Sequence, residues 1–200
     1  MERRWNHRRD MMRAIALAGL LALPLPACVA SSRVQPVSVT EADYVPLSKK
    51  GASWIYRTVK TGRIEGKLTI VNEGYAVFEG RASTRFSWDY GDRDGRRYDQ
   101  YLALSEGQVL VIGRDVVTMG STVESRGRFD PPLLLMKGQV LRRTQMTVPA
   151  GQFEGIEVVS KETGFTKTEW WVKGVGLIKQ EFLYTSGSRV RHELVQYSIP

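Results

Sequence analysis

His192 is the residue whose type points most directly to acid–base or nucleophilic chemistry, because the other histidine, His7, lies near the start of the chain. Paired with a serine hydroxyl, a histidine acts as a general base. No G-x-S-x-G elbow accompanies it, and one histidine without a cysteine partner cannot build the usual zinc site. We therefore expect His192 to be an exposed strand residue, and we predict no catalytic residue and no enzymatic activity.

Aspartates gather between Asp89 and Asp99, where a calcium ion would need carboxylate oxygens. Residues 92–95, Asp-Arg-Asp-Gly, resemble the middle of an EF-hand loop. The match fails at the first ligand position, which is Tyr90, and at the twelfth, which is Tyr101. Aspartate and glycine are also the ordinary residues of a hairpin tip. We predict a turn here, and neither a metal nor another cofactor.

Cys28 is the single cysteine of the chain, and it follows Leu25-Pro-Ala27. This stretch resembles the lipobox of bacterial lipoproteins, in which the thiol receives a lipid and becomes the new N-terminus; Pro26 departs from the pattern. The competing interpretation is cleavage near Ala30, which leaves no lipid. Because a secreted chain normally pairs its cysteines, a lone one at this place favours lipidation of Cys28.

An apolar run, residues 14–27, precedes this cysteine and follows an arginine-rich start. It is shorter than the roughly 20 residues that cross a membrane as a helix. A basic segment, a short apolar segment and small residues describe a cleaved signal peptide. We predict a signal peptide over 1–27, a flexible tether over 28–44 and one β domain over 45–200, with Met11 or Met12 as alternative initiators.

These features predict a lipoprotein anchored in the bacterial cell envelope and facing the periplasm. The residue immediately after Cys28 is Val29 and not an aspartate, which slightly favours the outer membrane. The formal net charge of +8 is spread over isolated pairs such as Arg96-Arg97 and Arg142-Arg143. Without a basic stripe, nucleic acid is not an expected partner. The expected partner is the membrane, through the lipid anchor, with an apolar ligand or an envelope protein as further candidates.

Short strands dominate the chain from about Tyr44 onward, and glycine recurs roughly every ten residues. The segments rich in β-branched and aromatic residues are 53–59, 66–71, 75–88, 98–104, 108–112, 115–118, 140–148, 153–160, 166–172, 177–185 and 190–198. No helical stripe occurs after residue 30. The pattern predicts an all-β fold: a single antiparallel meander forming a curved sheet, a sandwich or a partly open barrel.

Large aromatic residues are the candidates for a ligand site. Trp54, Trp88, Trp170 and Phe182 either pack in the core or form the aromatic wall of a cavity inside a half-barrel. Adjacent residues of a strand point to opposite faces, so Trp170 and Trp171 cannot both face one core. The one that faces outward is a candidate for a partner surface.

Residues 130–136, Asp-Pro-Pro-Leu-Leu-Leu-Met, differ from the other segments. Two prolines interrupt ladder pairing, and apolar residues follow without alternation. We expect a connection that crosses the core between two sheets; an exposed apolar surface for docking or lipid contact is the alternative.

Three fragments occur in a familiar order: residues 129–135, residues 148–153 (Val-Pro-Ala-Gly-Gln-Phe) and residues 171–179 (Trp-Val-Lys-Gly-Val-Gly-Leu-Ile-Lys). Together they resemble bacterial exported proteins and lipoproteins of unknown function, the group of domain of unknown function 3108 and TapB. The resemblance covers roughly residues 125–182. It implies an antiparallel β domain outside the cytoplasm, and it implies no reaction.

Three functions follow as hypotheses. The first is a non-enzymatic binding or envelope-maintenance role. The second is a carrier or chaperone for a lipid or another apolar ligand, which requires a cavity lined by several of Trp54, Trp88, Trp170, Phe182 and Leu133–Leu135. The third is a hydrolase, which requires a polar cleft around His192 or a close carboxylate pair.

Overall fold

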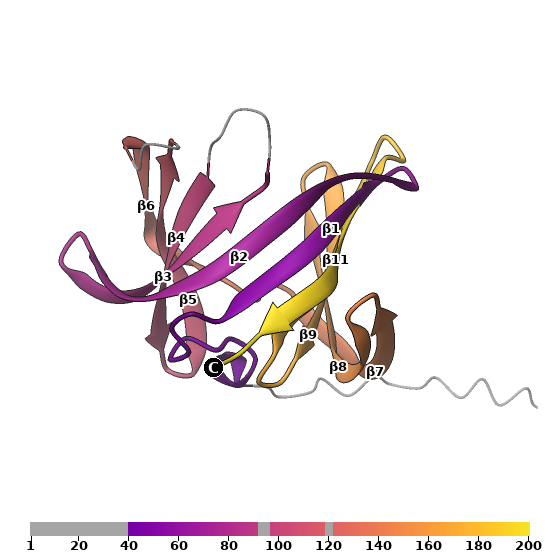
Figure 1. Cartoon of the computed structure of the whole chain (residues 1–200), viewed down its shortest axis with the longest axis horizontal. Coiled ribbons are helices and arrows are strands. Elements are labelled where there is room, and N and C mark those ends of the chain that lie inside the picture. Colours follow the sequence, from indigo (N-terminus) through magenta and orange to yellow (C-terminus); the bar gives the residue numbers. More distant parts are fainter. Residues whose placement is uncertain (1–39, 92–96, 119–121) are drawn as a thin grey trace, which may run out of the picture. The chain divides into compact units, whose positions relative to one another are not determined.

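The computed structural model describes residues 40–91, 97–118 and 122–200. Cys28 and the predicted signal peptide lie outside them, as do residues 92–95 of the predicted turn. The described part holds one short 3-10 helix, η1 (Glu41–Asp43), and eleven strands (Figure 1). The strands are β1 (Ser53–Lys60), β2 (Arg63–Phe78), β3 (Arg81–Asp89), β4 (Arg97–Ser105), β5 (Gln108–Val117), β6 (Val123–Leu134), β7 (Gln139–Val148), β8 (Gly151–Glu162), β9 (Phe165–Val172), β10 (Gly176–Tyr184) and β11 (Arg189–Ser198).

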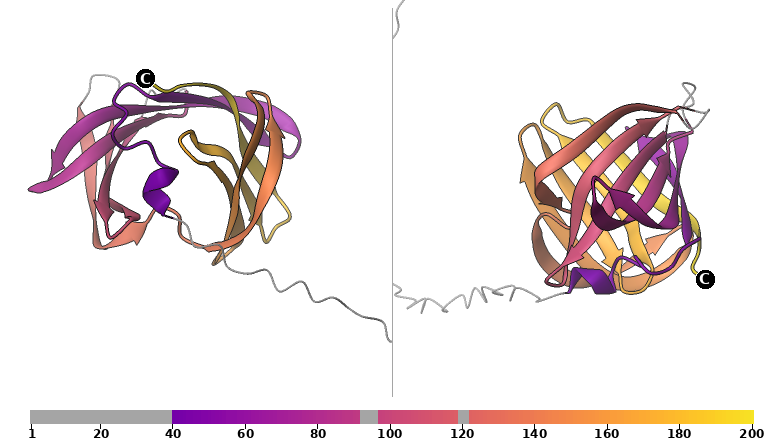
Figure 2. Two further views of the ribbon diagram at one scale, coloured as in Figure 1. Left: turned by 90° about the horizontal axis from the view of Figure 1, so that it is seen from below. Right: turned by 90° about the vertical axis from the view of Figure 1, so that its left-hand side faces the viewer.

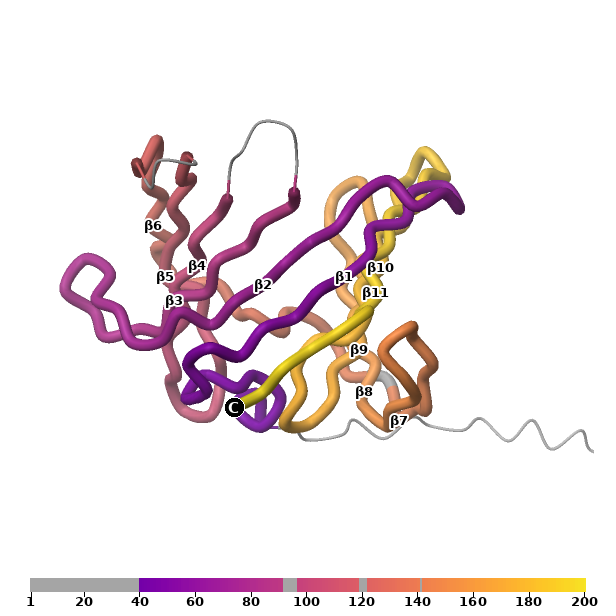
Figure 3. Tube along the Cα trace, in the orientation of Figure 1, coloured from indigo at the N-terminus to yellow at the C-terminus, as the bar shows by residue number. Residues whose placement is uncertain are grey.

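All eleven strands belong to one antiparallel sheet, which confirms the predicted all-β meander. Their order is β6-β5-β4-β3-β2-β1-β11-β10-β9-β8-β7. Strands that follow one another in the chain are neighbours, except for β6 and β7. In addition, β1 and β11, from the two ends of the domain, pair in the middle of the sheet (Figure 3). The edges are β6 and β7, which are consecutive in the chain but do not pair. The sheet is therefore an open one, with its gap between β6 and β7.

Strong curvature turns this open sheet into an arch (Figure 2). One limb, β2 to β6, faces the other, β7 to β10, across a concave side. Register shifts occur in most strand pairs, for example between Leu177 and Lys179 on β10. Such β-bulges bend and twist a strand, and repeated along a sheet they give it the shape of a partly open barrel.

The Pro-Pro segment continues the edge strand β6 of this same sheet. The ladder between β5 and β6 is interrupted between the pairs Gly113–Arg128 and Val111–Leu133. The expectation that prolines break the pairing is confirmed, because proline cannot donate to a ladder and is tolerated at an edge. The expectation of a connection between two sheets is wrong, because the described residues form a single sheet.

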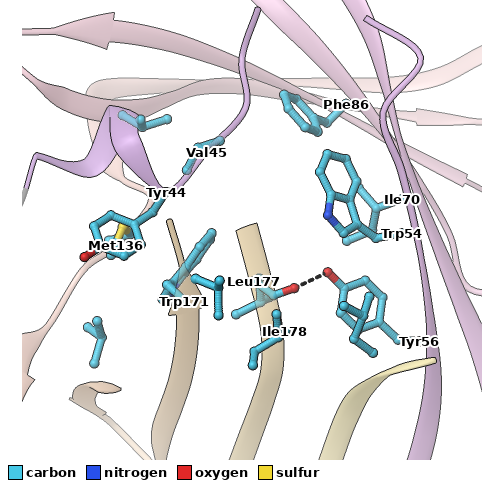
Figure 4. Close-up of a cluster of buried hydrophobic side chains, with 14 of the residues drawn as sticks. Tyr44, Val45, Trp54, Tyr56, Ile70, Phe86, Met136, Trp171, Leu177 and Ile178 are labelled. Atoms are coloured by element: carbon cyan, nitrogen blue, oxygen red, sulfur yellow. Dashed lines mark hydrogen bonds between the residues drawn. The ribbon is translucent and has the colours of Figure 1, made fainter. Parts of the chain in front are cut away.

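Aromatic side chains of β1 cover the middle of the concave face of the sheet. Trp54 and Tyr56 point inward on alternate positions, as the strand period requires, and both are buried. The Tyr56 hydroxyl donates to the carbonyl oxygen of Leu177 at 2.6 Å (Figure 4). The Trp54 indole N–H donates to the carbonyl oxygen of Val175 at 2.7 Å. These bonds link β1 to the start of β10, across the intervening β11.

The segment around η1 spans the two limbs at one end of the arch (Figure 2). The buried Glu41 carboxylate accepts from the backbone N–H of Val109, on β5, at 2.9 Å. The Asp43 carbonyl accepts from Gly174, in the turn between β9 and β10, at 2.9 Å. The predicted tether includes residues 40–44, but these pack on the sheet, because Glu41 and Tyr44 are buried.

A second, smaller cluster lies on the outer face, where the long β2–β3 hairpin folds back. Phe78, at the end of β2, packs at 4.4 Å between ring centroids on Tyr101 of β4. A Cβ atom added at Gly113 of β5 would meet the Phe78 ring at 2.1 Å. The absence of a side chain at Gly113 therefore lets the hairpin lie against β5.

Replacing Gly113 by alanine should lower the free energy of unfolding by about 1–3 kcal/mol, because overpacking forces the Phe78 ring from its place. Urea unfolding followed by circular dichroism measures the change. Gly127→Ala, on the paired strand β6, is the matched control: its Cβ would meet Arg114 at an ordinary 3.7 Å. In the background Phe78→Ala, the cost of Gly113→Ala should shrink; equal costs in both backgrounds would contradict this account.

Candidate ligand cavity

A cavity of about 840 Å³ occupies the concave side of the arch. Both limbs and the segment after η1 contribute to its wall: Val45 and Pro46 follow η1, Leu102 and Val111 belong to β4 and β5, and Leu177 to β10. Pockets of roughly 300–1,000 Å³ hold a single small ligand. Most of the wall is aliphatic or aromatic, so the cavity suits an apolar molecule or the apolar part of an amphiphile.

Three of the four aromatic residues predicted for a ligand site line this cavity: Trp54, Trp88 and Phe182. The fourth, Trp170, is not among the lining residues. Its indole N–H donates to Glu157 at 3.3 Å, and the Lys179 ammonium lies 4.5 Å from its ring centroid. Trp171 lines the cavity instead (Figure 4). The two tryptophans thus face opposite sides, as the strand period requires; ligand binding by these residues stays a prediction.

Apolar residues at the edge strand and at the ends of other strands complete the wall. Leu133, Leu134 and Leu135 contribute from the β6 edge, and the first two are partly exposed. Phe165, the first residue of β9, packs its ring at 5.7 Å from that of Phe182. The sequence predicts these leucines as cavity residues, but it did not identify Phe165. Alternation along β9 could have found Phe165, because it lies an even number of residues before Trp171 and therefore on the same face.

Polar residues form part of the β9–β10 wall and were also missed by sequence reasoning. The Glu169 carboxylate, 3% exposed, accepts from the Gln180 amide at 2.7 Å and pairs with the Lys167 ammonium at 3.1 Å. Burial raises the pKa of Glu169, while Lys167 opposes that shift. Lys167 and Glu169 share the parity of Trp171, which is the signal that could have placed them inside.

His192 is buried, so the expectation of an exposed strand histidine is wrong. It is 8% exposed, and its Nδ1 lies 3.1 Å from the Thr58 hydroxyl oxygen. The physical reason is its position: β11 is a central strand, paired with β1 and β10, and His192 points to the concave side near the Phe182 ring. Burial lowers the pKa of His192, which favours the neutral imidazole.

The two acidic residues of the predicted turn that the structure describes are Asp89, which accepts from the backbone N–H of Gly91 at 2.7 Å, and Asp99, which forms ion pairs. Asp99 is buried on β4 and lies 3.4 Å from Arg97 and 3.8 Å from Arg85. Among the described residues, no group of three or more histidine, cysteine, aspartate or glutamate side chains is placed to hold a metal ion. Within the same residues, no helix has the length and apolar character to span a membrane.

His192→Gln should flatten the loss of stability on acidification. The lowered pKa of the folded state means that the unfolded chain binds the proton first, so the free energy of unfolding falls as pH drops below about 6.5. Urea unfolding at pH 7.5, 6 and 5 measures how the free energy of unfolding changes with pH. The same pH dependence in His192→Gln as in the unaltered protein would contradict a lowered pKa of His192.

Glu169→Gln should make the loss of stability on acidification steeper. The raised pKa of Glu169 in the folded state means that this residue removes stability as pH rises above 4.5, and the substitution abolishes that opposing contribution. The same urea experiment measures the change.

Comparison with known proteins shows that this fold is similar to that of a solved structure. No family model and no curated protein matches the sequence. The structure is similar to that of a candidate lipoprotein from Parabacteroides distasonis, with a TM-score of 0.51 and 12% identity, over 76% of this chain and 96% of that one. A candidate exported protein with a YmcC-like fold from Bacteroides fragilis gives a TM-score of 0.45 and 10% identity, over 76% of this chain and 97% of that one. At such identities the likeness to the first shows a shared fold alone.

Proposed function

We propose that this protein is a lipid-anchored protein of the bacterial cell envelope that binds and carries one apolar or amphipathic ligand in its concave cavity, without catalysing a reaction. The cavity of about 840 Å³ carries this proposal. Had side chains filled the concave side of the arch, the carrier hypothesis would have lost its basis. A lipoprotein is also in keeping with the description of the Parabacteroides distasonis protein whose fold it shares.

The chemistry of the wall supports binding of an apolar group. Trp88, Phe165 and Phe182 are half-buried and present carbon surface to the cavity, and a ligand that covers this surface gains roughly 25 cal/mol for each Å² removed from water. The sheet is open between β6 and β7, where Leu133 and Leu134 lie partly exposed beside the cavity. This edge is the entry route that we propose for the ligand.

The proposal also includes a lipid anchor on Cys28 and kinship with a group of exported bacterial proteins. A lipid on Cys28 would hold the β domain near a membrane, because the twelve residues up to Thr40 extend to at most about 40 Å. We propose the outer membrane as the site of the anchor, with the β domain facing the periplasm. The cavity would then lie within reach of envelope lipids. The fragments over 129–135, 148–153 and 171–179 support kinship with the group of domain of unknown function 3108 and TapB; the second of them forms the β7–β8 turn.

Phe182→Asp should weaken binding of an apolar fluorophore by at least about 10-fold, because a carboxylate in the wall must be desolvated when the ligand enters. The mature protein is titrated with N-phenyl-1-naphthylamine, whose emission rises in apolar surroundings. Leu183→Asp is the matched control: it adds the same charge to the next position of β10, which does not line the cavity. Equal weakening in both variants, or no binding by the unaltered protein, would contradict the proposal.

Mass spectrometry of the native protein extracted from membranes should show an acylated N-terminal Cys28 and a co-purified lipid. The mass of the N-terminal peptide tests the anchor, and organic extraction of the same sample tests the ligand. Cys28→Ser is expected to move the protein from the membrane to the soluble fraction. An unmodified N-terminus near Ser31 would refute the anchor and leave the cavity hypothesis standing.

A further inference from the structure

Apolar residues form the end of the cavity that lies nearest to η1. This short helix bonds to β5 and to the turn between β9 and β10, so it marks one end of the arch (Figure 2). Close to these contacts, Leu102 of β4 pairs with Val111 of β5, which pairs with Leu133 of β6. Trp171 and Leu177 form the corresponding level on the opposite limb (Figure 4).

Polar residues of the wall lie further from η1, in the next levels of the same ladders. On one limb, Gln100 of β4 pairs with Arg114 of β5. On the other limb, Glu169 pairs with Gln180, and Lys167 lies two residues further along β9 from the η1 end. The cavity is therefore amphipathic along its length, which suits a ligand with an apolar chain and a polar head group.

Both carboxylates of the cavity wall already have cationic partners. The Glu169 side chain is 4% exposed, and it is held by the Lys167 ammonium at 3.1 Å. Glu162 pairs with the Lys137 ammonium at 2.8 Å. Burial raises the pKa of Glu169, and a proton on this residue would leave the charge of Lys167 uncompensated. In either protonation state, these two pairs give the wall no excess negative charge.

Arg114 gives the polar end an excess positive charge. Its side chain is exposed and lines the cavity, and within the described part of the chain its guanidinium forms no ion pair. Partial burial raises the pKa of Tyr90, another wall residue, and the nearby charge of Arg114 opposes that shift. The guanidinium therefore acts on the polar end of the cavity. Its planar donors match the geometry of a carboxylate or a phosphate.

We propose that the ligand of the cavity is an amphiphile with an anionic head group, a carboxylate or a phosphate, which contacts Arg114 while the acyl chain lies at the apolar end below; this inference rests on the function proposed above. The apolar wall supplies most of the affinity, because a partly hydrated ion pair contributes little. Arg114 sets the direction in which the amphiphile lies and the sign of the charge that it carries.

Four amphiphiles with the same twelve-carbon chain separate the head groups: laurate, dodecyl phosphate, 1-lauroylglycerol and dodecyltrimethylammonium. Each displaces N-phenyl-1-naphthylamine from the mature protein at pH 7.5, below its micellar concentration. We expect one or both anions to bind at least about 5-fold more tightly than dodecyltrimethylammonium, because the cation meets repulsion where the anions are attracted. The difference should shrink between about 0.02 M and about 0.5 M NaCl, since salt screens exposed charges. The anion that binds more tightly tells a carboxylate ligand from a phosphate ligand.

Arg114→Gln tests the contact itself. It should weaken binding of the preferred anion by about 2- to 5-fold and leave binding of 1-lauroylglycerol and the fluorophore unchanged. Arg114→Glu should reverse the order, so that dodecyltrimethylammonium binds more tightly than the anions. Arg63→Gln is the matched control, because it removes the same charge from an exposed position of β2 that does not line the cavity. A thermal melt confirms that each variant is folded.

The outcomes distinguish this inference from the function on which it rests. Anions that bind no more tightly than dodecyltrimethylammonium, or an equal effect of Arg114→Gln and Arg63→Gln, overturn the head-group assignment while the fluorophore still reports an apolar cavity. Failure of the fluorophore and all four amphiphiles to bind overturns both.

Discussion

The pairing of β1 with β11 is the constraint on which the rest of the structure depends. Each limb of the arch is a meander of local hairpins, and this ladder between the two ends of the domain joins them. On its outer face Arg57 bonds to Glu193 at 2.7 Å, and on its concave face Thr58 meets His192. Without this junction the limbs would not face each other, and their side chains would enclose no cavity.

Polar groups of the chain then hold the arch at a defined opening. The Tyr56 hydroxyl bonds across β11 to β10, and burial raises its pKa, so it remains a donor throughout the physiological range. The segment after η1 is held by Asn72, whose amide donates to the carbonyls of Pro46 at 2.8 Å and Leu47 at 3.1 Å. This segment and η1 cross between the limbs at one end of the arch, where they bond to β5 and to the β9–β10 turn, and so connect the two limbs.

The balance of apolar and polar groups in the cavity connects fold to function. A purely structural core of this size would be filled by side chains, because protein interiors pack as densely as organic crystals. Here about 840 Å³ stays open between aromatic walls, while the Glu169 carboxylate of the same wall is buried and held by Gln180 and Lys167. An apolar group that covers the aromatic wall would complete the interior.

Local patterning determined the fold class and much of the aromatic wall. Alternation along each strand, with glycine at the turns, predicted the antiparallel meander, and Trp54, Trp88 and Phe182 were identified as residues able to line a half-barrel. The same alternation established that Trp170 and Trp171 face opposite sides, because it depends only on the pleat of one strand. Which of the two faces inward depends on how the sheet curves, and that is a property of many strands together.

Tertiary structure decided everything that depends on position within the sheet. His192 reads as an exposed strand residue, but its strand pairs on both sides at the centre of the arch, which buries it. Glu169 was not identified from the sequence, and curvature of the sheet buries it on the concave side beside Lys167. The sequence by itself determined which residues share a face of each strand; long-range pairing and bulges decided which face is concave, since these depend on residues far apart in the chain.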